Sequence, residues 1–384
     1  MKLFILQEKL KEGLKLIEKV SLKTINLPVL NNVLISAKKN FLNLSSTNLE
    51  IGIQWWGLAK IEKEGEVLVP NYLFSNFINL LPNKQVEIKK ENDFLIVRCG
   101  EYIEKIKTFP IEDFPIFPQT NKDYYIELNS EYFCQGLEQV VDIASLSQTK
   151  PEFTGVYVVI NKDYIKLVAT DSFRLGEKTL FTQKMNTVFN LINSEVSFIL
   201  PQKTAKEIIN IFKQKKERIK IYPSPDHILI EKEMKELKHS EICLTSRLID
   251  GEYPNYQDII PNKFDNQIIV NRNDFLNQLK IAALFSGKDN TVTLKINPQK
   301  EEIEILSKSL DYGEHQSFLK GKIKSKEKEI SFNEKFLSYG LSVINSSEIF
   351  LGINNSENNN QEKPVVIKDI NNSDYLYIVM PRIP

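Results

Sequence analysis

The sequence predicts an α+β protein built from three copies of one unit, each with two helices and antiparallel sheets. A recurring helical stripe of apolar residues, a second recurring helix and alternating segments between them lead to this prediction. With 384 residues, the chain has room for two or three domains. We place the copies at 1–122, 123–261 and 262–384.

The first helix of each copy is predicted by apolar residues at positions i, i+4 and i+7, which share one helical face. A single offset of 123 residues relates the first two copies, and the third copy repeats the same spacing. The second helices are expected within 67–90, 198–214 and 330–353. The three stripes consist of Leu10, Leu14 and Ile17; Phe133, Leu137 and Val140; and Phe275, Leu279 and Ala282.

Strands are predicted between these helices, because segments such as 156–169 alternate apolar and polar residues and carry polar hairpin tips. The apolar stripes of the helices are expected to cover one face of the sheets. The same offset of 123 aligns Thr47-Asn48 with Thr170-Asp171. The second copy differs after this turn, where it carries Phe-Arg-Leu at 173–175.

Composition and charge indicate a globular protein without a net electrostatic field. Lysine plus arginine and aspartate plus glutamate each total 50, so a nucleic acid would have to be met by a local basic patch. Three scattered cysteines are typical of reduced thiols in a cytoplasm. No apolar run approaches ~18 residues, so no membrane span is expected.

Motifs of catalysis are missing from the sequence. It has no phosphate-binding or dinucleotide-binding glycine pattern, and its three histidines are isolated from any set with metal-ligand spacing. We therefore expect a binding protein without cofactor or metal rather than an enzyme. Two other classes stay open: a hydrolase or transferase with a site assembled from distant residues, and a repeat adaptor that binds partners without encircling DNA.

Several motifs, in this order, resemble the bacterial DNA sliding clamps, the beta subunits of DNA polymerase III. They are LPVLNNVLISA (27–37), LVATDSFRL (167–175), RLIDGEYPNYQDIIP (247–261) and YIVMPRIP (377–384). The resemblance implies three DNA-clamp domains and a homodimer that closes head to tail into a ring around duplex DNA. It also implies a non-enzymatic processivity factor that docks the replicative polymerase, the clamp loader and repair proteins.

The resemblance places the two helices of each copy along the hole of the ring. A sliding ring needs attraction to phosphates without base readout, since base contacts would stop its motion. The helix at 201–216 is rich in lysine, and the family's loops beside the hole correspond to 21–26 and 147–150. The DNA-binding residues expected from this are Lys23, Lys150, Lys203 and Lys206.

The resemblance also implies a surface pocket that receives short linear peptides with leucine and phenylalanine anchors. We expect Thr170 and Arg174 to supply polar contacts at its rim, and two prolines to hold its walls. Phe173 stands where the family commonly has a histidine. The expected pocket residues are Phe153, Thr170, Phe173, Arg174, Leu175, Pro254, Ile259, Ile378, Met380 and Pro381.

Ring closure is expected to join the first copy of one protomer to the third copy of the other. Two strand-like segments, 101–107 and 301–306, suggest where the protomers meet, with lysines of the former available to glutamates of the latter. The expected apolar residues at this seam are Ile103, Ile106, Leu284 and Phe285.

Overall fold

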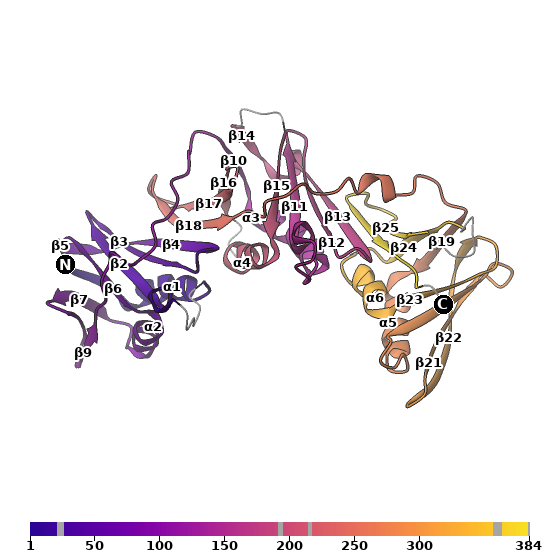
Figure 1. Ribbon diagram of the computed structural model, residues 1–384, viewed down its shortest axis with the longest axis horizontal. Coiled ribbons are helices and arrows are strands. Elements are labelled where there is room, and N and C mark those ends of the chain that lie inside the picture. Colours follow the sequence, from indigo (N-terminus) through magenta and orange to yellow (C-terminus); the bar gives the residue numbers. More distant parts are fainter. Residues whose placement is uncertain (21–26, 191–194, 214–216, 356–362, 383–384) are drawn as a thin grey trace. The chain divides into compact units, whose positions relative to one another are not determined.

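The computed structural model describes residues 1–20, 27–190, 195–213, 217–355 and 363–382. The order of elements recurs in each copy: a strand and a helix, four or five strands, a second helix, and three strands (Figure 1). Three copies with two helices each are therefore confirmed.

The elements of each copy are short and regular. The first copy has β1 (Lys2–Leu6), α1 (Gln7–Ile17), β2 (Asn32–Lys38), β3 (Phe41–Thr47), β4 (Ile51–Leu58), β5 (Lys60–Lys63), β6 (Gly65–Pro70), α2 (Asn71–Leu80), β7 (Gln85–Glu91), β8 (Phe94–Cys99) and β9 (Tyr102–Lys107). The second has β10 (Tyr125–Asn129), α3 (Ser130–Val140), β11 (Gly155–Asn161), β12 (Tyr164–Thr170), β13 (Arg174–Phe181), β14 (Val188–Asn190), β15 (Glu195–Pro201), α4 (Gln202–Phe212), β16 (Arg218–Pro223), β17 (His227–Glu233) and β18 (Ser240–Arg247). The third has β19 (Asn266–Asn271), α5 (Arg272–Ala283), β20 (Thr291–Asn297), β21 (Glu302–Ser309), β22 (Gly313–Lys324), β23 (Lys328–Asn333), α6 (Glu334–Ser342), β24 (Glu348–Ile353), β25 (Val365–Asp369) and β26 (Tyr375–Val379).

Two compact units contain these elements, and the second copy contributes to both. The first unit comprises residues 1–134, 182–196 and 203–248, and the second comprises 135–181, 197–202 and 249–384.

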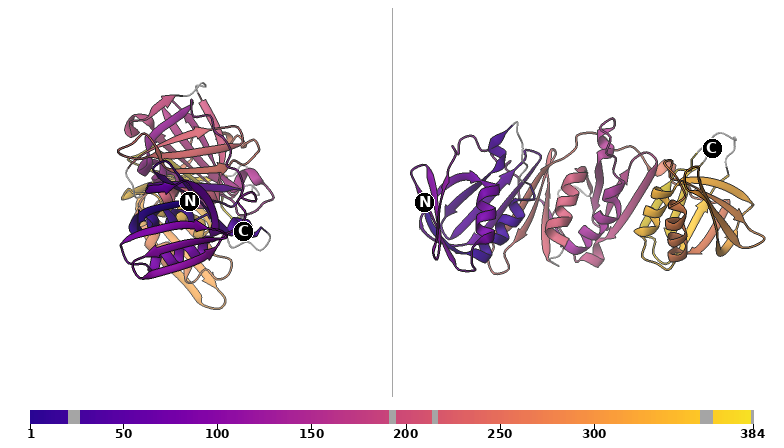
Figure 2. Two further views of the ribbon diagram at one scale, coloured as in Figure 1. Left: turned by 90° about the vertical axis from the view of Figure 1, so that its left-hand side faces the viewer. Right: turned by 90° about the horizontal axis from the view of Figure 1, so that it is seen from below.

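The first unit holds a five-stranded sheet, β5-β1-β7-β8-β9, and a nine-stranded sheet, β14-β10-β16-β17-β18-β4-β3-β2-β6. The longer sheet crosses from the second copy into the first, because β18 pairs with β4 in antiparallel register, with Leu244 opposite Ile53. Helices α1 and α2 lie side by side in the first copy (Figure 2). Gly13 of α1 packs on the ring of Trp55, and any side chain there would meet that ring.

The second unit holds one twelve-stranded sheet, β15-β11-β12-β13-β26-β25-β24-β19-β22-β21-β20-β23. The second and third copies join where β13 pairs with β26, and Leu175 lies opposite Ile378. Helices α5 and α6 lie side by side in the third copy. The apolar stripe of α5, Phe275, Leu279 and Ala282, is buried as its spacing predicts.

An asparagine caps the first helix of the second copy and of the third copy. The side chain of Asn271 caps α5 by accepting a hydrogen bond from the amide of Asp274, and Asn129 caps α3 by accepting one from the amide of Glu131. Each cap satisfies a backbone donor that the first turn of a helix leaves free.

Candidate functional site: the groove at the β13–β26 pair

The turn after β12 is held by its own side chains. Thr170 Oγ1 donates to the carbonyl of Arg174 at 2.7 Å and accepts from the amide of Ser172. Asp171 Oδ1 accepts from the amides of Phe173 and Arg174, both at 3.0 Å. Ser172 has a φ of +77°, which costs a residue with a side chain some strain and is tolerated where such bonds fix the turn. The turn therefore presents Phe173, 61% exposed, at the surface.

The first copy contains the same turn. Thr47 Oγ1 donates to the carbonyl of Ile51, and Asn48 Oδ1 accepts from the amides of Glu50 and Ile51. Leu49 has a φ of +74°, as Ser172 does. The alignment of Thr47-Asn48 with Thr170-Asp171 made from the sequence is therefore confirmed as a structural repeat.

A groove of about 450 Å³ lies beside the second-copy turn, within the second unit. Its floor is formed across neighbouring strands: Thr170 lies opposite Leu175, and Leu175 lies opposite Ile378. The groove is lined by Thr170, Ser172, Phe173, Arg174, Leu175, Asp258, Ile259, Ile260, Pro261, Asn354, Lys363, Pro364, Ile378 and Met380.

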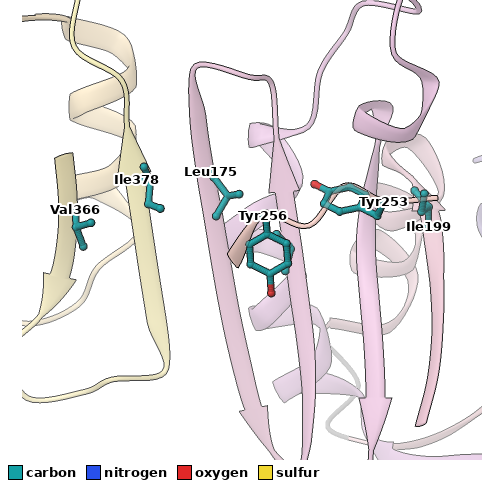
Figure 3. Close-up of a cluster of buried hydrophobic side chains, with 7 residues drawn as sticks. Leu175, Ile199, Tyr253, Tyr256, Val366 and Ile378 are labelled. Atoms are coloured by element: carbon teal, nitrogen blue, oxygen red, sulfur yellow. The ribbon is translucent and has the colours of Figure 1, made fainter. Parts of the chain in front are cut away.

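The floor residues Leu175 and Ile378 belong to a buried hydrophobic cluster that also includes Tyr256 (Figure 3). The hydroxyl of Tyr256 donates to Glu177, the β13 residue two positions after Leu175. Burial, together with the neighbouring carboxylate, raises the pKa of Tyr256, so this phenol stays a neutral donor. The segment after β18 is thus fastened to the strand that forms the floor.

Arg174 stabilises the turn from beneath. Its guanidinium donates to Asp171 at 3.0 Å and to the carbonyl of Asp142 at 2.9 Å. It also lies 4.7 Å from the ring centroid of Phe336 and 4.8 Å from that of Tyr339, which are cation–π distances. The turn, β13 and α6 are therefore tied together at this one side chain.

Three family models together match nearly the whole chain: the DNA polymerase III beta subunit N-terminal domain over residues 1–118, the central domain over 127–255 and the C-terminal domain over 257–383. The beta sliding clamp of Synechococcus elongatus is 27% identical, over 99% of both chains. That of Bacillus subtilis is 25% identical over the same shares. The crystal structure of the Bacillus subtilis DNA polymerase sliding clamp superposes with a TM-score of 0.90, at 24% identity over 100% of this chain and 99% of that one.

The chain belongs to the DNA polymerase III beta subunit family. Its function is that of a beta sliding clamp, the non-catalytic processivity factor of DNA polymerase III. The prediction of a non-enzymatic clamp made from the sequence is therefore confirmed. No helix among the described residues is long and apolar enough to cross a membrane.

The structure brings seven of the ten residues expected in the pocket of this clamp into the groove: Thr170, Phe173, Arg174, Leu175, Ile259, Ile378 and Met380. The other three lie outside its lining. Phe153 packs behind the floor, with its ring 5.9 Å from that of Tyr253, while Pro254 is exposed and Pro381 is buried.

The expected polar roles at the rim need correction. The hydroxyl of Thr170 and the guanidinium of Arg174 are both committed to bonds within the protein. Their part is to hold the turn, and the exposed rim is formed instead by Phe173, Ser172 and Ile259. Residues 258–261 and 363–364 also line the groove, although sequence reasoning named only Ile259 among them.

Two of the lysines expected to meet DNA, Lys203 and Lys206, are exposed on α4, and the opposite face of this helix is buried through Thr204, Ala205 and Ile208. Lys150 is exposed and lies 5.0 Å from the ring of Phe153. Lys23 lies outside the described residues.

The residues expected at the seam fall into two groups. Ile103 of β9 and Leu284 at the end of α5 are 57% and 70% exposed. Ile106, however, is buried within the first copy, and Phe285 is half-buried and stacks on His315 with ring centroids 5.8 Å apart.

The third-copy segment suggested for the seam, 301–306, lies in an interior strand. Residues 302–309 form β21, which pairs on one side with β20 and on the other with β22. Its Glu302 is bound by Lys320 at 2.9 Å. An interior strand has no free backbone edge, so β21 cannot pair with a second protomer.

We predict that Asp171→Ala loosens the groove turn, because the amides of Phe173 and Arg174 lose their shared acceptor and Arg174 loses its ion pair. Hydrogen exchange of these two amides should accelerate by at least about tenfold, since hydrogen bonds to a charged acceptor contribute about 1.5–3 kcal/mol.

The matched control is Asn48→Ala in the first copy. It should accelerate exchange at Glu50 and Ile51 while leaving Phe173 and Arg174 unchanged. Equal protection of Phe173 and Arg174 in Asp171→Ala and the unmodified protein would contradict the role given to Asp171.

Proposed function

We propose that the groove is the docking site for short linear peptides of the polymerase and of other clamp-binding proteins, including the clamp loader. The observation that supports this proposal is the apolar cross-strand floor of Leu175 and Ile378, which lies open beside an exposed aromatic ring. Apolar floors of this kind accept leucine and phenylalanine side chains, and a rigid turn limits the ordering cost of binding. Met380 adds an adaptable wall that suits several partners.

Two copies of the chain, in this proposal, close head to tail around duplex DNA in the cytoplasm, with domains near 1–122, 123–261 and 262–384. Head-to-tail contacts form rings when their rotation closes. The strand β9 supports the first half of the seam, because it is the last strand of the five-stranded sheet and exposes Tyr102 and Ile103.

The second half of the proposed seam is β22. Residues 313–320 of this strand pair with β21 on one side, and β19 pairs only with residues 321–324. Among the described strands, the other side of 313–320 is therefore unpaired, and Leu284 lies exposed on the neighbouring helix α5. An edge of this kind can add a strand from another chain by backbone hydrogen bonding.

Peptide binding is the first test. Met380→Ala should weaken the binding of a labelled polymerase-derived peptide by at least about fivefold, or about 1 kcal/mol. The reason is that the substitution removes most of an apolar side chain that lines the groove. The matched control is Arg382→Ala, since Arg382 bonds to Thr291 at 2.7 Å and to Ser331 rather than lining the groove. The described lining contains no histidine, so affinity should stay constant between pH ~6 and ~8. Equal peptide affinity of Met380→Ala and the unmodified chain would argue against docking here.

The seam is tested by charge placed at its exposed apolar residues. Ile103→Asp or Leu284→Asp should bury an unpaired carboxylate at the contact and yield folded monomers, as measured by light scattering. Ile116→Asp is the control, because Ile116 is 96% exposed on the segment after the first copy. A dimer mass that survives both seam variants would rule out β9 and α5 as the contact.

DNA retention is tested on α4. Lys203→Glu with Lys206→Glu should reduce retention on nicked circular duplex equally for all sequences, and should lower the slope of log affinity against log salt by about 2. Lys38→Glu with Lys39→Glu changes the net charge equally on the exposed β2–β3 hairpin and should have a smaller effect. Retention insensitive to the α4 pair would show that this helix does not meet DNA.

A further inference from the structure

A further cavity of about 450 Å³ lies within the first unit. It is lined by residues of α1 and β4 from the first copy, and by β17, β18 and the turn between them from the second. Its apolar walls are Trp55, Trp56, Leu58, Met234 and Leu237. We call it the tryptophan cavity, because both tryptophans of the chain line it. No residue lines both this cavity and the groove, so the two are separate sites.

One wall of the tryptophan cavity carries a buried hydrogen-bond donor. Trp55 is held between α1 and β4, where a side chain on Gly13 or Gly57 would collide with its ring. The residue is 2% exposed, and among the residues that the structure describes, none accepts a hydrogen bond from its indole N–H. A buried indole N–H usually has an acceptor. A ligand that brings a carbonyl oxygen into the cavity would supply one.

Another wall is the turn between β17 and β18, which is fixed by its own contacts. The amide of Met234 donates to the carbonyl of His239 at 2.9 Å, and the amide of His239 donates to the carbonyl of Leu237 at 2.8 Å. The ring of His239 stacks on Phe41 with centroids 3.9 Å apart, and lies edge-on to Trp56 at 5.9 Å. A wall that is already fixed loses little conformational freedom when a ligand binds.

The charges around the tryptophan cavity disfavour a negative ligand. Three lysines and four glutamates line it. Lys232, with 6% of its side chain exposed, lies between Glu217 at 2.5 Å and Glu241 at 2.6 Å, and the other two lysines also have glutamate partners. Of the charged residues in the described lining, only Glu236 has no ion pair. Phosphate is therefore repelled here, whereas a basic group is attracted to Glu236.

We infer that the tryptophan cavity is a docking site for a short peptide with an aromatic or leucine side chain next to a basic residue. The apolar side chain fills the space between the tryptophans, a peptide carbonyl accepts from Trp55, and the basic side chain pairs with Glu236. Two or three adjacent residues of a peptide supply all three groups. Leu58 and Leu237 are 55% and 43% exposed, so the cavity is open to a side chain that enters from solvent. This inference does not depend on peptide docking in the groove.

The test uses the two tryptophans as reporters. Because no other tryptophan is present, emission excited where tyrosine does not absorb reports on this cavity alone. Titration with acetyl-Lys-Phe-Leu-amide should change the emission saturably, with a midpoint below about 1 mM. Acetyl-Glu-Phe-Leu-amide should bind several-fold more weakly, since its carboxylate meets Glu236.

Three variants separate the three contacts. Leu237→Asp should weaken binding of the lysine peptide by at least about fivefold, because it places a carboxylate at an exposed apolar wall. Glu236→Gln should remove the preference for the lysine peptide over the glutamate peptide. Trp55→Phe keeps an aromatic ring but loses the N–H, so it should weaken both peptides by a similar factor while Trp56 still reports binding.

Matched controls lie on the same unit outside the cavity. Leu49→Asp alters a leucine that is 44% exposed, and Glu112→Gln alters an exposed glutamate. Both should bind the two peptides like the unmodified chain.

The inference is overturned if the lysine peptide causes no saturable change in emission, or if Leu237→Asp binds it as tightly as the unmodified chain. Equal affinity of the unmodified chain for the two peptides would refute the selection of a basic residue by Glu236. Loss of affinity in the cavity variants but not in the controls supports the inference, and the exposed positions of Leu237 and Glu236 keep the test independent of folding.

Discussion

Backbone pairing between β13 and β26 is the contact on which the groove depends. It sets Leu175 beside Ile378, and it continues beyond the strand into a hydrogen bond of 2.8 Å from the amide of Met380 to the carbonyl of Phe173. The two residues that border the groove are thus fixed to each other by main-chain atoms. Since the strands come from different copies, the groove exists only because the third copy folds against the second.

The junction of the first two copies has the same backbone pairing but different side chains. There β4 pairs with β18, and the amide of Arg247 donates to the carbonyl of Glu50, just as Met380 does to Phe173. Gly52 stands at the position of Leu175, and the ring of Phe117 fills the space above it. The cavity at this junction is about 240 Å³, against about 450 Å³ for the groove. The same backbone arrangement therefore occurs at both junctions, and the side chains determine the size of the cavity at each.

The distribution of charge matters more than its sum. Equal numbers of acidic and basic residues leave the chain without net charge. Cross-strand pairs such as Lys308–Glu314 bring opposite charges together, whereas Lys203 and Lys206 are exposed at the surface of α4. A chain without net charge can attract phosphate only through such local groups of lysines.

The repeat, the helices and the turn all follow from local patterns in the sequence. Apolar spacing at Leu10, Leu14 and Ile17 is a local property of a helix, and the Thr-Asp turn is closed by atoms within five residues. The motifs and their order were enough to identify the family.

Which residues share the groove and which strands have free edges depend on how distant segments pair in the folded chain. Sequence reasoning placed Phe153 and Pro381 in the groove and 301–306 at the seam, but the first two lie outside the lining and the last is an interior strand. It also left out Asp258, from the short helix Gln257–Ile259, and Lys363, from the segment before β25. Alternation predicts a strand but not its neighbours, because pairing is set by contacts between residues distant in sequence.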